Sequence, residues 1–126
     1  MTVLILYRSW HVGARLIYSL SKIRNISVLT GSPRVEESLR IVADFSPGIV
    51  IVDAQTGEGA GIEVLRKLKS LDVAPVVIMT ASSPYQQYRQ ECLKSGADFY
   101  FELPAEIEQL STVVMDLTDR SSIDDG

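Results

Sequence analysis

Short runs of consecutive apolar residues, each followed by a stretch with helical periodicity, constrain the fold of this chain more than any other feature. The clearest run is residues 49–52, Ile-Val-Ile-Val, which has no polar alternation and ends at Asp53. Such a run is typical of a central parallel strand that is covered on both faces. Similar runs occupy residues 3–7, 26–30, 76–79 and 99–101. We therefore predict five strands.

The segments between these runs carry apolar residues three or four positions apart, which predicts amphipathic helices. The four clearest stripes are Val12/Leu16/Leu20/Ile23, Val35/Leu39/Val42/Phe45, Ile62/Leu65/Leu68/Leu71 and Ile107/Leu110/Val114/Leu117. A more polar helix is predicted over residues 84–93, with Gly96 as its cap. Alternating strands and helices with short connections predict an α/β fold, in which a parallel sheet has helices on both faces.

Size and composition exclude several classes of protein. A chain of 126 residues is one domain in length. Its net charge of −4 argues against a dedicated binder of nucleic acid or of anionic membranes, and no apolar run is long enough to span a bilayer. The first strand lacks the basic region and cleavage site of a signal peptide. The single cysteine, Cys92, has no internal disulfide partner and is predicted to be a small buried hydrophobe. We expect a cytoplasmic protein.

Charge is unevenly distributed along the chain. Residues 98–126 contain eight acidic residues and one basic residue, whereas residues 1–97 contain eleven basic and eight acidic residues. An acidic final quarter is either a solvated face or an interaction surface. Residues 119–126 are polar without periodicity, so we predict a domain over residues 1–118 and then a polar tail or the start of an interdomain linker.

Two polar residues stand at the carboxyl ends of predicted strands, where sites in open α/β sheets form. Asp53 ends the third strand and precedes a glycine-rich loop, and Thr80 ends the fourth strand. From its position alone, Asp53 is a candidate nucleophile, metal ligand or loop cap. A structural turn is the competing role, because aspartate commonly stabilises such turns.

Several segments together resemble a response-regulator receiver domain. They are residues 47–53, Gly61, residues 63–68, residues 74–81, and residues 96–101 with Pro104. The resemblance extends over residues 2–118. It implies a flavodoxin-like (CheY-like), doubly wound, five-stranded parallel sheet of order 2-1-3-4-5, flanked by five helices.

The resemblance also implies roles for individual residues. Asp53 stands where receivers accept a phosphoryl group from a partner histidine kinase, and Thr80 stands where a hydroxyl binds the phosphoryl oxygen. Tyr100 matches the aromatic residue that changes rotamer with the threonine, and Pro104 matches a proline that follows a cis peptide bond. The residues expected to line this site are Tyr7, Arg8, Gln55, Ala81, Leu103 and Pro104.

Three positions depart from the receiver pattern. Tyr7 and Arg8 replace the two acidic residues that hold Mg²⁺ in the family, and Leu103 replaces its lysine. Magnesium takes hard oxygen ligands, and phosphoryl transfer depends on neutralising charge on the phosphoryl oxygens. We therefore predict a pseudo-receiver without a metal site or cofactor, which does not undergo efficient Mg²⁺-dependent phosphorylation. The alternatives are a conventional phospho-accepting receiver with an altered metal requirement, and a small α/β module that binds a flavin or nucleotide.

Arg8 has two competing interpretations. Its guanidinium could pair with Asp53 and replace magnesium as the resident cation. In the other interpretation Arg8 points to solvent while Tyr7 packs under the next loop. The neighbouring Trp10 is expected either to shield the pocket or, preferably, to be a partly buried packing residue.

The expected function is regulated protein–protein interaction in a two-component or phosphorelay system, without enzymatic activity. The expected partners are a histidine kinase or another signalling protein, together with an output domain in a longer chain. A homodimer through the last two helices and the fifth strand is a further expectation. Acidic residues on that surface, among them Glu106, Glu108 and Asp116, favour a basic partner.

Overall fold

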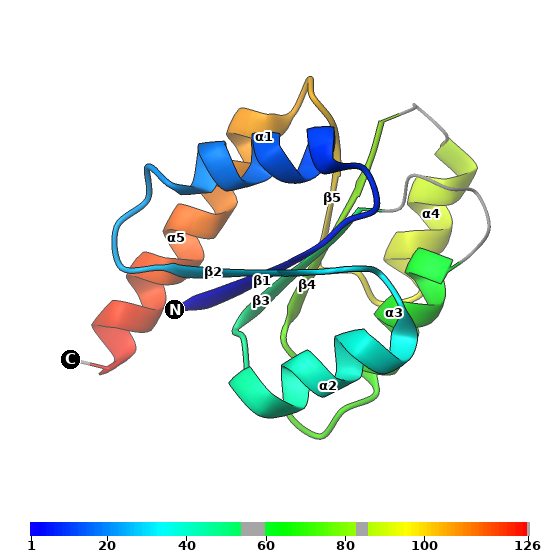
Figure 1. Cartoon of the computed structure of the whole chain (residues 1–126), viewed down its shortest axis with the longest axis horizontal. Coiled ribbons are helices and arrows are strands. Elements are labelled where there is room, and N and C mark those ends of the chain that lie inside the picture. Colours follow the sequence, from blue (N-terminus) through cyan, green and yellow to red (C-terminus); the bar gives the residue numbers. More distant parts are fainter. Residues whose placement is uncertain (54–59, 83–85, 126) are drawn as a thin grey trace.

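A computed structural model describes residues 1–53, 60–82 and 86–125 of the chain. It contains five parallel strands in the order β2-β1-β3-β4-β5, as predicted. The strands are β1 (Thr2–Leu6), β2 (Ser27–Gly31), β3 (Ile49–Asp53), β4 (Val76–Ala81) and β5 (Phe99–Glu102). The helices are α1 (Trp10–Leu20), α2 (Val35–Phe45), α3 (Ala60–Lys69), α4 (Gln86–Lys94) and α5 (Ile107–Asp125). Figure 1 shows the alternation of strands and helices along the chain.

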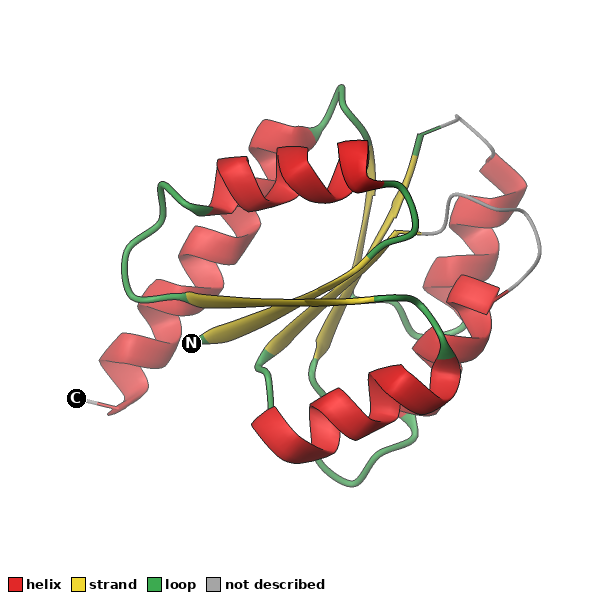
Figure 2. Cartoon of the chain, viewed as in Figure 1, coloured by secondary structure: helices red, strands yellow, loops and turns green. Residues whose placement is uncertain are grey.

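The sheet separates two layers of helices (Figure 2). Alternate strand residues point to opposite faces, so each strand contributes to two cores. On one face, residues such as Leu4, Val50 and Met79 pack with α2, α3 and α4. On the other face, residues such as Ile5 and Ile51 pack with α1 and α5. Every residue of β3 is buried, as its unbroken apolar sequence predicts.

Two of the helices are followed by a residue with a positive φ, and one of these residues is the predicted cap Gly96. Ser46, at the C-cap of α2, is left-handed, with a φ of 46°. Gly96 follows α4 with a φ of +108°, its amide donates to the Leu93 carbonyl, and the Ala97 amide donates to the Cys92 carbonyl. This pair of bonds is a Schellman motif, in which glycine adopts the left-handed conformation without a Cβ penalty.

The observed ends of some elements differ from the predicted ones. The last helix continues to Asp125, so most of the predicted polar tail at residues 119–126 is helical. Polar residues without periodicity can extend a helix that is already anchored by Leu110 and Val114, both fully buried. The start of the predicted fourth helix, including Pro84, lies outside the described residues. Within the part of the chain that the structure describes, no helix is both long and apolar enough to cross a membrane.

Candidate functional site

Asp53 and Thr80 meet at the carboxyl ends of β3 and β4. The two residues are directly paired in the strand register, and Thr80 Oγ1 donates a hydrogen bond to Asp53 Oδ1 at 3.1 Å. Asp53 is 3% exposed and Thr80 is fully buried. The other carboxylate oxygen, Oδ2, is buried without a hydrogen-bond partner. The prediction that strand ends bring these two side chains together is confirmed.

Burial changes the acidity of this carboxyl group. Desolvation raises the pKa of Asp53 to about 6, and the hydrogen bond from Thr80 opposes the rise. A carboxylate with one unsatisfied oxygen is costly to keep charged in a buried position, and among the described residues no cation contributes to the pKa of Asp53. The site therefore holds a carboxyl group whose charge changes with pH not far below neutrality.

Tyr7 directly follows β1, and its side chain packs on the face of the sheet that α1 and α5 cover. Its amide donates to the Gly31 carbonyl at 3.1 Å, and its ring packs with the α1 and α5 core. The ring lies so close to Gly13 of α1 that a Cβ at that position would clash with it. Tyr7 thus packs against the helix α1, whereas the second interpretation expected it under the next loop.

Arg8 is not paired with Asp53. Among the residues that the structure describes, no ion pair or hydrogen bond joins the two side chains, and Arg8 does not contribute to the pKa of Asp53. Arg8 is exposed and lines a surface pocket at the start of α2. The other residues lining that pocket are Pro33, Arg34, Val35, Glu36, Glu37, Arg40 and Glu63. The interpretation of Arg8 as a substitute cation for Asp53 is therefore wrong.

Leu103 follows β5 and belongs to the core. It is 5% exposed, packs with the residues of the α1 and α5 face, and donates its amide to the Ala81 carbonyl at 2.8 Å. The Leu103–Pro104 peptide bond is cis, as the resemblance implies. Pro104 itself is exposed. At the position of the family's lysine, the chain thus places an apolar side chain in the core.

Tyr100 projects to the other face of the sheet from Thr80. It pairs with Met79, one position before the pair formed by Thr80 and Phe101, so the pleat turns it toward the α2–α4 layer. Its ring lies 6.3 Å from that of Tyr88 in α4, and its hydroxyl is buried without a hydrogen-bond partner. Burial raises the pKa of Tyr100.

Sequence reasoning missed two contacts of this region, those of Tyr88 and of Gly13. Tyr88 of α4 contacts Tyr100, and its helical spacing to the buried Cys92 is the sequence signal that points to a buried side of this helix. The contact between Gly13 and Tyr7 has no local sequence signal, because the two residues meet only when α1 packs on the sheet. Gln55, predicted to line the site, lies outside the described residues.

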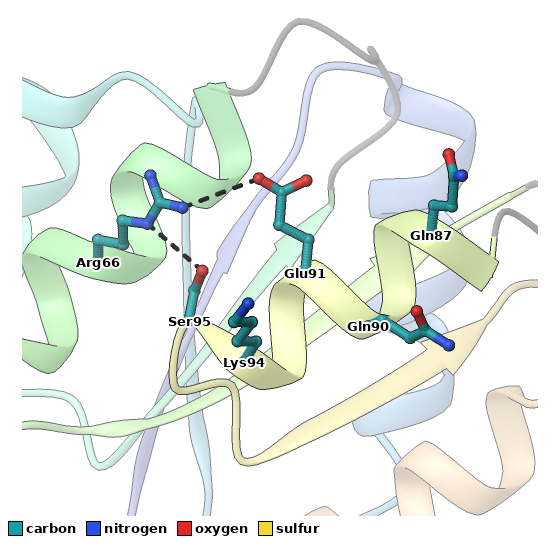
Figure 3. A pocket seen from close by; sticks show the side chains of 6 residues that line it. All are labelled: Arg66, Gln87, Gln90, Glu91, Lys94 and Ser95. Atoms are coloured by element: carbon teal, nitrogen blue, oxygen red, sulfur yellow. Dashed lines mark hydrogen bonds and ion pairs between the residues drawn. The ribbon is translucent and has the colours of Figure 1, made fainter.

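A separate pocket lies between α3 and α4 (Figure 3). Arg66 donates to Ser95 Oγ at 3.3 Å and approaches Glu91 at 3.8 Å. The remaining lining residues are Gln87, Gln90 and Lys94. These side chains are polar and mostly exposed, and none of them is a predicted site residue. This pocket does not extend the Asp53 site.

Comparison with known proteins identifies the family. The family described as "Response regulator receiver domain" matches residues 13–115. The chain belongs to the response regulator receiver domain family. As a receiver domain, it is the signal-receiving part of a two-component system, and its flavodoxin-like fold is the one that the resemblance implies.

The relatives and solved structures agree with this assignment. The receiver domain is 33% identical over 91 residues to "Response regulator MprA" of Mycobacterium sp. (strain KMS), an alignment that covers 71% of this chain and 39% of MprA. It is 36% identical over 77 residues to "Virulence transcriptional regulatory protein PhoP" of Salmonella typhimurium (strain LT2), which covers 60% of this chain and 34% of PhoP. The chain thus spans well under half the length of these curated relatives.

A solved receiver domain shows the same fold along almost the whole chain. The receiver domain of the Francisella response regulator 1452 aligns with a TM-score of 0.79 at 21% identity, covering 95% of this chain and 98% of that one. At this level of identity the likeness concerns the fold, which the two chains share from end to end.

The described residues do not fit the magnesium site of the family. Asp53 is the only carboxylate among the described residues predicted to line the site; Tyr7 packs against α1, and Arg8 faces the pocket at the start of α2. In the part of the chain that the structure describes, no group of three or more His, Cys, Asp or Glu side chains could hold a metal ion. Hard divalent cations need several oxygen ligands, which these residues do not supply.

Proposed function

We propose that this receiver domain regulates protein–protein contacts without efficient Mg²⁺-dependent phosphorylation of Asp53. The observation that carries the proposal is the placement of Tyr7 against α1 and of Leu103 in the core. Receivers use the corresponding positions for a metal-binding acid and for a lysine. Here both side chains take part in packing, and neither supplies a carboxylate or an ammonium group at Asp53.

The chemistry of phosphoryl transfer supports this proposal. A phosphoryl group carries charge on its equatorial oxygens, and catalysis consists mostly of positioning it and neutralising that charge. Around Asp53 the described residues offer one hydrogen-bond donor, Thr80, and no cation. An added phosphoryl group would place further negative charge in a buried site that already disfavours one charge.

Incubation with acetyl phosphate and Mg²⁺ tests the proposal, with intact-protein mass spectrometry as the measurement. We expect only a trace of the phosphorylated species. Arg8→Asp returns one carboxylate at an exposed position without disturbing the core, so this variant should gain Mg²⁺-dependent phosphorylation. Stoichiometric labelling of the unmodified chain, lost in Asp53→Asn, would contradict the proposal.

A second candidate is a phospho-accepting receiver with an altered metal requirement. It is favoured by the retained pair of Asp53 and Thr80, whose geometry leaves one carboxylate oxygen without a partner. Labelling that persists in the presence of a chelator and depends on Asp53 would establish this alternative. A flavin or nucleotide module, the third alternative, would show a cofactor absorbance or a nucleotide-induced thermal shift.

The proposed partners are a histidine kinase or another signalling protein, and an output domain in a longer chain. MprA and PhoP are named as response regulators or transcriptional regulators, and both are much longer than their aligned parts. Exposed acidic side chains of α5, Glu108 and Asp116, favour a basic surface on such a partner. In this proposal the domain has no enzymatic activity of its own, needs no cofactor and acts in the cytoplasm.

A further inference from the structure

The outer face of α1 carries large apolar side chains that are exposed. Trp10 is 67% exposed, Tyr18 is 68% exposed and Ile17 is 37% exposed. Their spacing of seven and eight residues places them on one side of the helix, which we call the α1 patch. Trp10 was expected to be partly buried, so its exposure corrects that prediction. Exposed aromatic clusters on one face mark interaction sites, because tryptophan and tyrosine are typical binding anchors.

The surroundings of the α1 patch are basic. Arg15 and Lys22 are exposed next to it, and no aspartate or glutamate occurs in the sequence before Glu36. The Lys22 ammonium lies 4.6 Å from the centre of the Tyr18 ring, so charge and aromatic surface are adjacent. A partner for the α1 patch therefore needs an apolar contact surrounded by acidic side chains.

Helix α5 presents such a surface beside α1. The two helices cover the same face of the sheet, as Figure 1 shows, and Ser19 of α1 hydrogen-bonds to Ser111 of α5. Met115 of α5 is 44% exposed. The exposed acidic residues of α5 are Glu108, Asp116 and Asp119.

In the part of the chain that the structure describes, no ion pair joins the basic side chains of α1 to the acidic side chains of α5. Among the described residues, the ion pairs are Arg66–Glu91 and Lys69–Asp98, and neither involves α1 or α5. The exposed basic side chains of α1 and acidic side chains of α5 thus remain available for a contact with another molecule.

We infer that two copies of this chain associate through α1 and α5. A two-fold axis that places α1 of one copy on α5 of the other also places the second α5 on the first α1. Both contacts are then made at once and the assembly closes as a dimer. The α1 patch covers the exposed Met115 of the partner, and the basic side chains of α1 face the acidic side chains of α5. This inference goes beyond the proposed function, because it involves no chemistry at Asp53.

The surface expected from the resemblance, formed by α4, β5 and α5, fits a second copy less well. The exposed side chains of α4 are polar or charged apart from Leu93. Anchors of an interface are large apolar or aromatic side chains. The α1 patch supplies three of them, and α4 supplies one.

Sedimentation equilibrium over a concentration series tests the inference. We expect a monomer–dimer equilibrium that weakens with added salt. Tyr18→Ala and Trp10→Ala should each raise the dissociation constant at least tenfold, as expected for interface anchors. Leu93→Ala in α4 is the matched control and should leave it unchanged. Far-ultraviolet circular dichroism and thermal unfolding check that the variants are folded.

Charge-reversed variants test the pairing of α1 with α5. The double variant Arg15→Glu/Lys22→Glu makes both helices acidic, and Asp116→Lys/Asp119→Lys makes the α5 surface basic like α1. Each variant alone should be monomeric, whereas an equimolar mixture should form a heterodimer, because opposite charges then face each other in both contacts.

Two results would overturn the inference. One is an unmodified chain that stays monomeric up to about 1 mM, where even a dissociation constant of 1 mM would be detected; the α1 patch would then belong to a different partner. The other is a dimer that Leu93→Ala disrupts while the α1 variants leave it intact, which would place the contact on α4, β5 and α5.

Discussion

Asp53 places a titratable carboxyl group in a buried position of this receiver domain. Its carboxyl group is buried at the end of β3, receives one hydrogen bond and has a pKa of about 6. The folded chain therefore binds this proton more tightly than the unfolded chain, whose aspartates titrate near pH 4. Between about pH 4 and pH 6, the free energy of unfolding should fall as pH rises.

Asp53→Asn tests this dependence. The contribution of Asp53 lowers the free energy of unfolding by up to about 1.4 kcal/mol per pH unit in that window. The asparagine variant should consequently be more stable than the unmodified chain at pH 7, and the difference should vanish toward pH 4. Urea unfolding at several pH values measures it. Asp44→Asn, at an exposed position on α2, is the control for the loss of one carboxylate. A difference that grows as pH falls would contradict the prediction.

Tyr7 and Gly13 form a second pair that acts at the scale of single residues. Because a Cβ at residue 13 would clash with the Tyr7 ring, Gly13→Ala should destabilise the chain. We expect a net loss of about 1–2 kcal/mol, since overpacking outweighs the gain in helix propensity. In a Tyr7→Ala background the same change should stabilise the chain by up to about 1 kcal/mol. Thermal unfolding of the four chains completes the cycle, and equal effects of Gly13→Ala in both backgrounds would refute the contact.

At the scale of elements, Asp98 joins three parts of the fold. Its Oδ2 accepts one hydrogen bond of 2.8 Å from the Val77 amide of β4 and another from Lys69 Nζ of α3. The same Lys69 ammonium donates to the Pro75 carbonyl at 3.0 Å. A residue just before β5 therefore fixes the start of β4 and the end of α3.

Asp98→Ala should lower the free energy of unfolding by about 1–2 kcal/mol, because it leaves the Val77 amide without its charged acceptor. Glu91→Ala is the matched control. Glu91 also pairs with a cation of α3, but at 3.8 Å and with both side chains more than half exposed. Its loss should cost less than about 0.5 kcal/mol. Equal losses of unfolding free energy in the two variants, measured by chemical unfolding, would contradict a stabilising role for the hydrogen bond between Asp98 and the Val77 amide.

The elements also show which kind of sequence signal is robust. The run at residues 49–52 specifies β3 because only a position covered on both faces accepts four consecutive β-branched residues. Polar stretches are less informative. Residues 119–125 continue α5, although their composition predicts a tail. Helix ends depend on how much of the preceding helix is anchored by packing, which local composition does not reveal.

At the scale of the whole molecule, the fold brings together a basic and an acidic segment that are far apart in the sequence. The basic first part and the acidic last quarter are far apart in the chain, yet α1 and α5 lie side by side on one face of the sheet (Figure 1). This neighbourhood follows from the strand order, which brings the first and last helices to the same face. The self-association that we infer belongs to this scale, because it needs α1, which has no acidic residue, and the acidic side chains of α5 on one face of the molecule.

The sequence by itself determined the fold class, the strand order implied by the family resemblance, and the meeting of Asp53 with Thr80. The fold class follows from apolar periodicity, the strand order from the resemblance, and the meeting of the two side chains from the rule that parallel strands end at a common edge. Only the tertiary structure decided where Tyr7, Arg8 and Leu103 point, and that Trp10 is exposed. The direction of a side chain at a strand end or in a loop depends on which helix packs against it. The side chain and the helix come into contact only when the helices pack on the sheet.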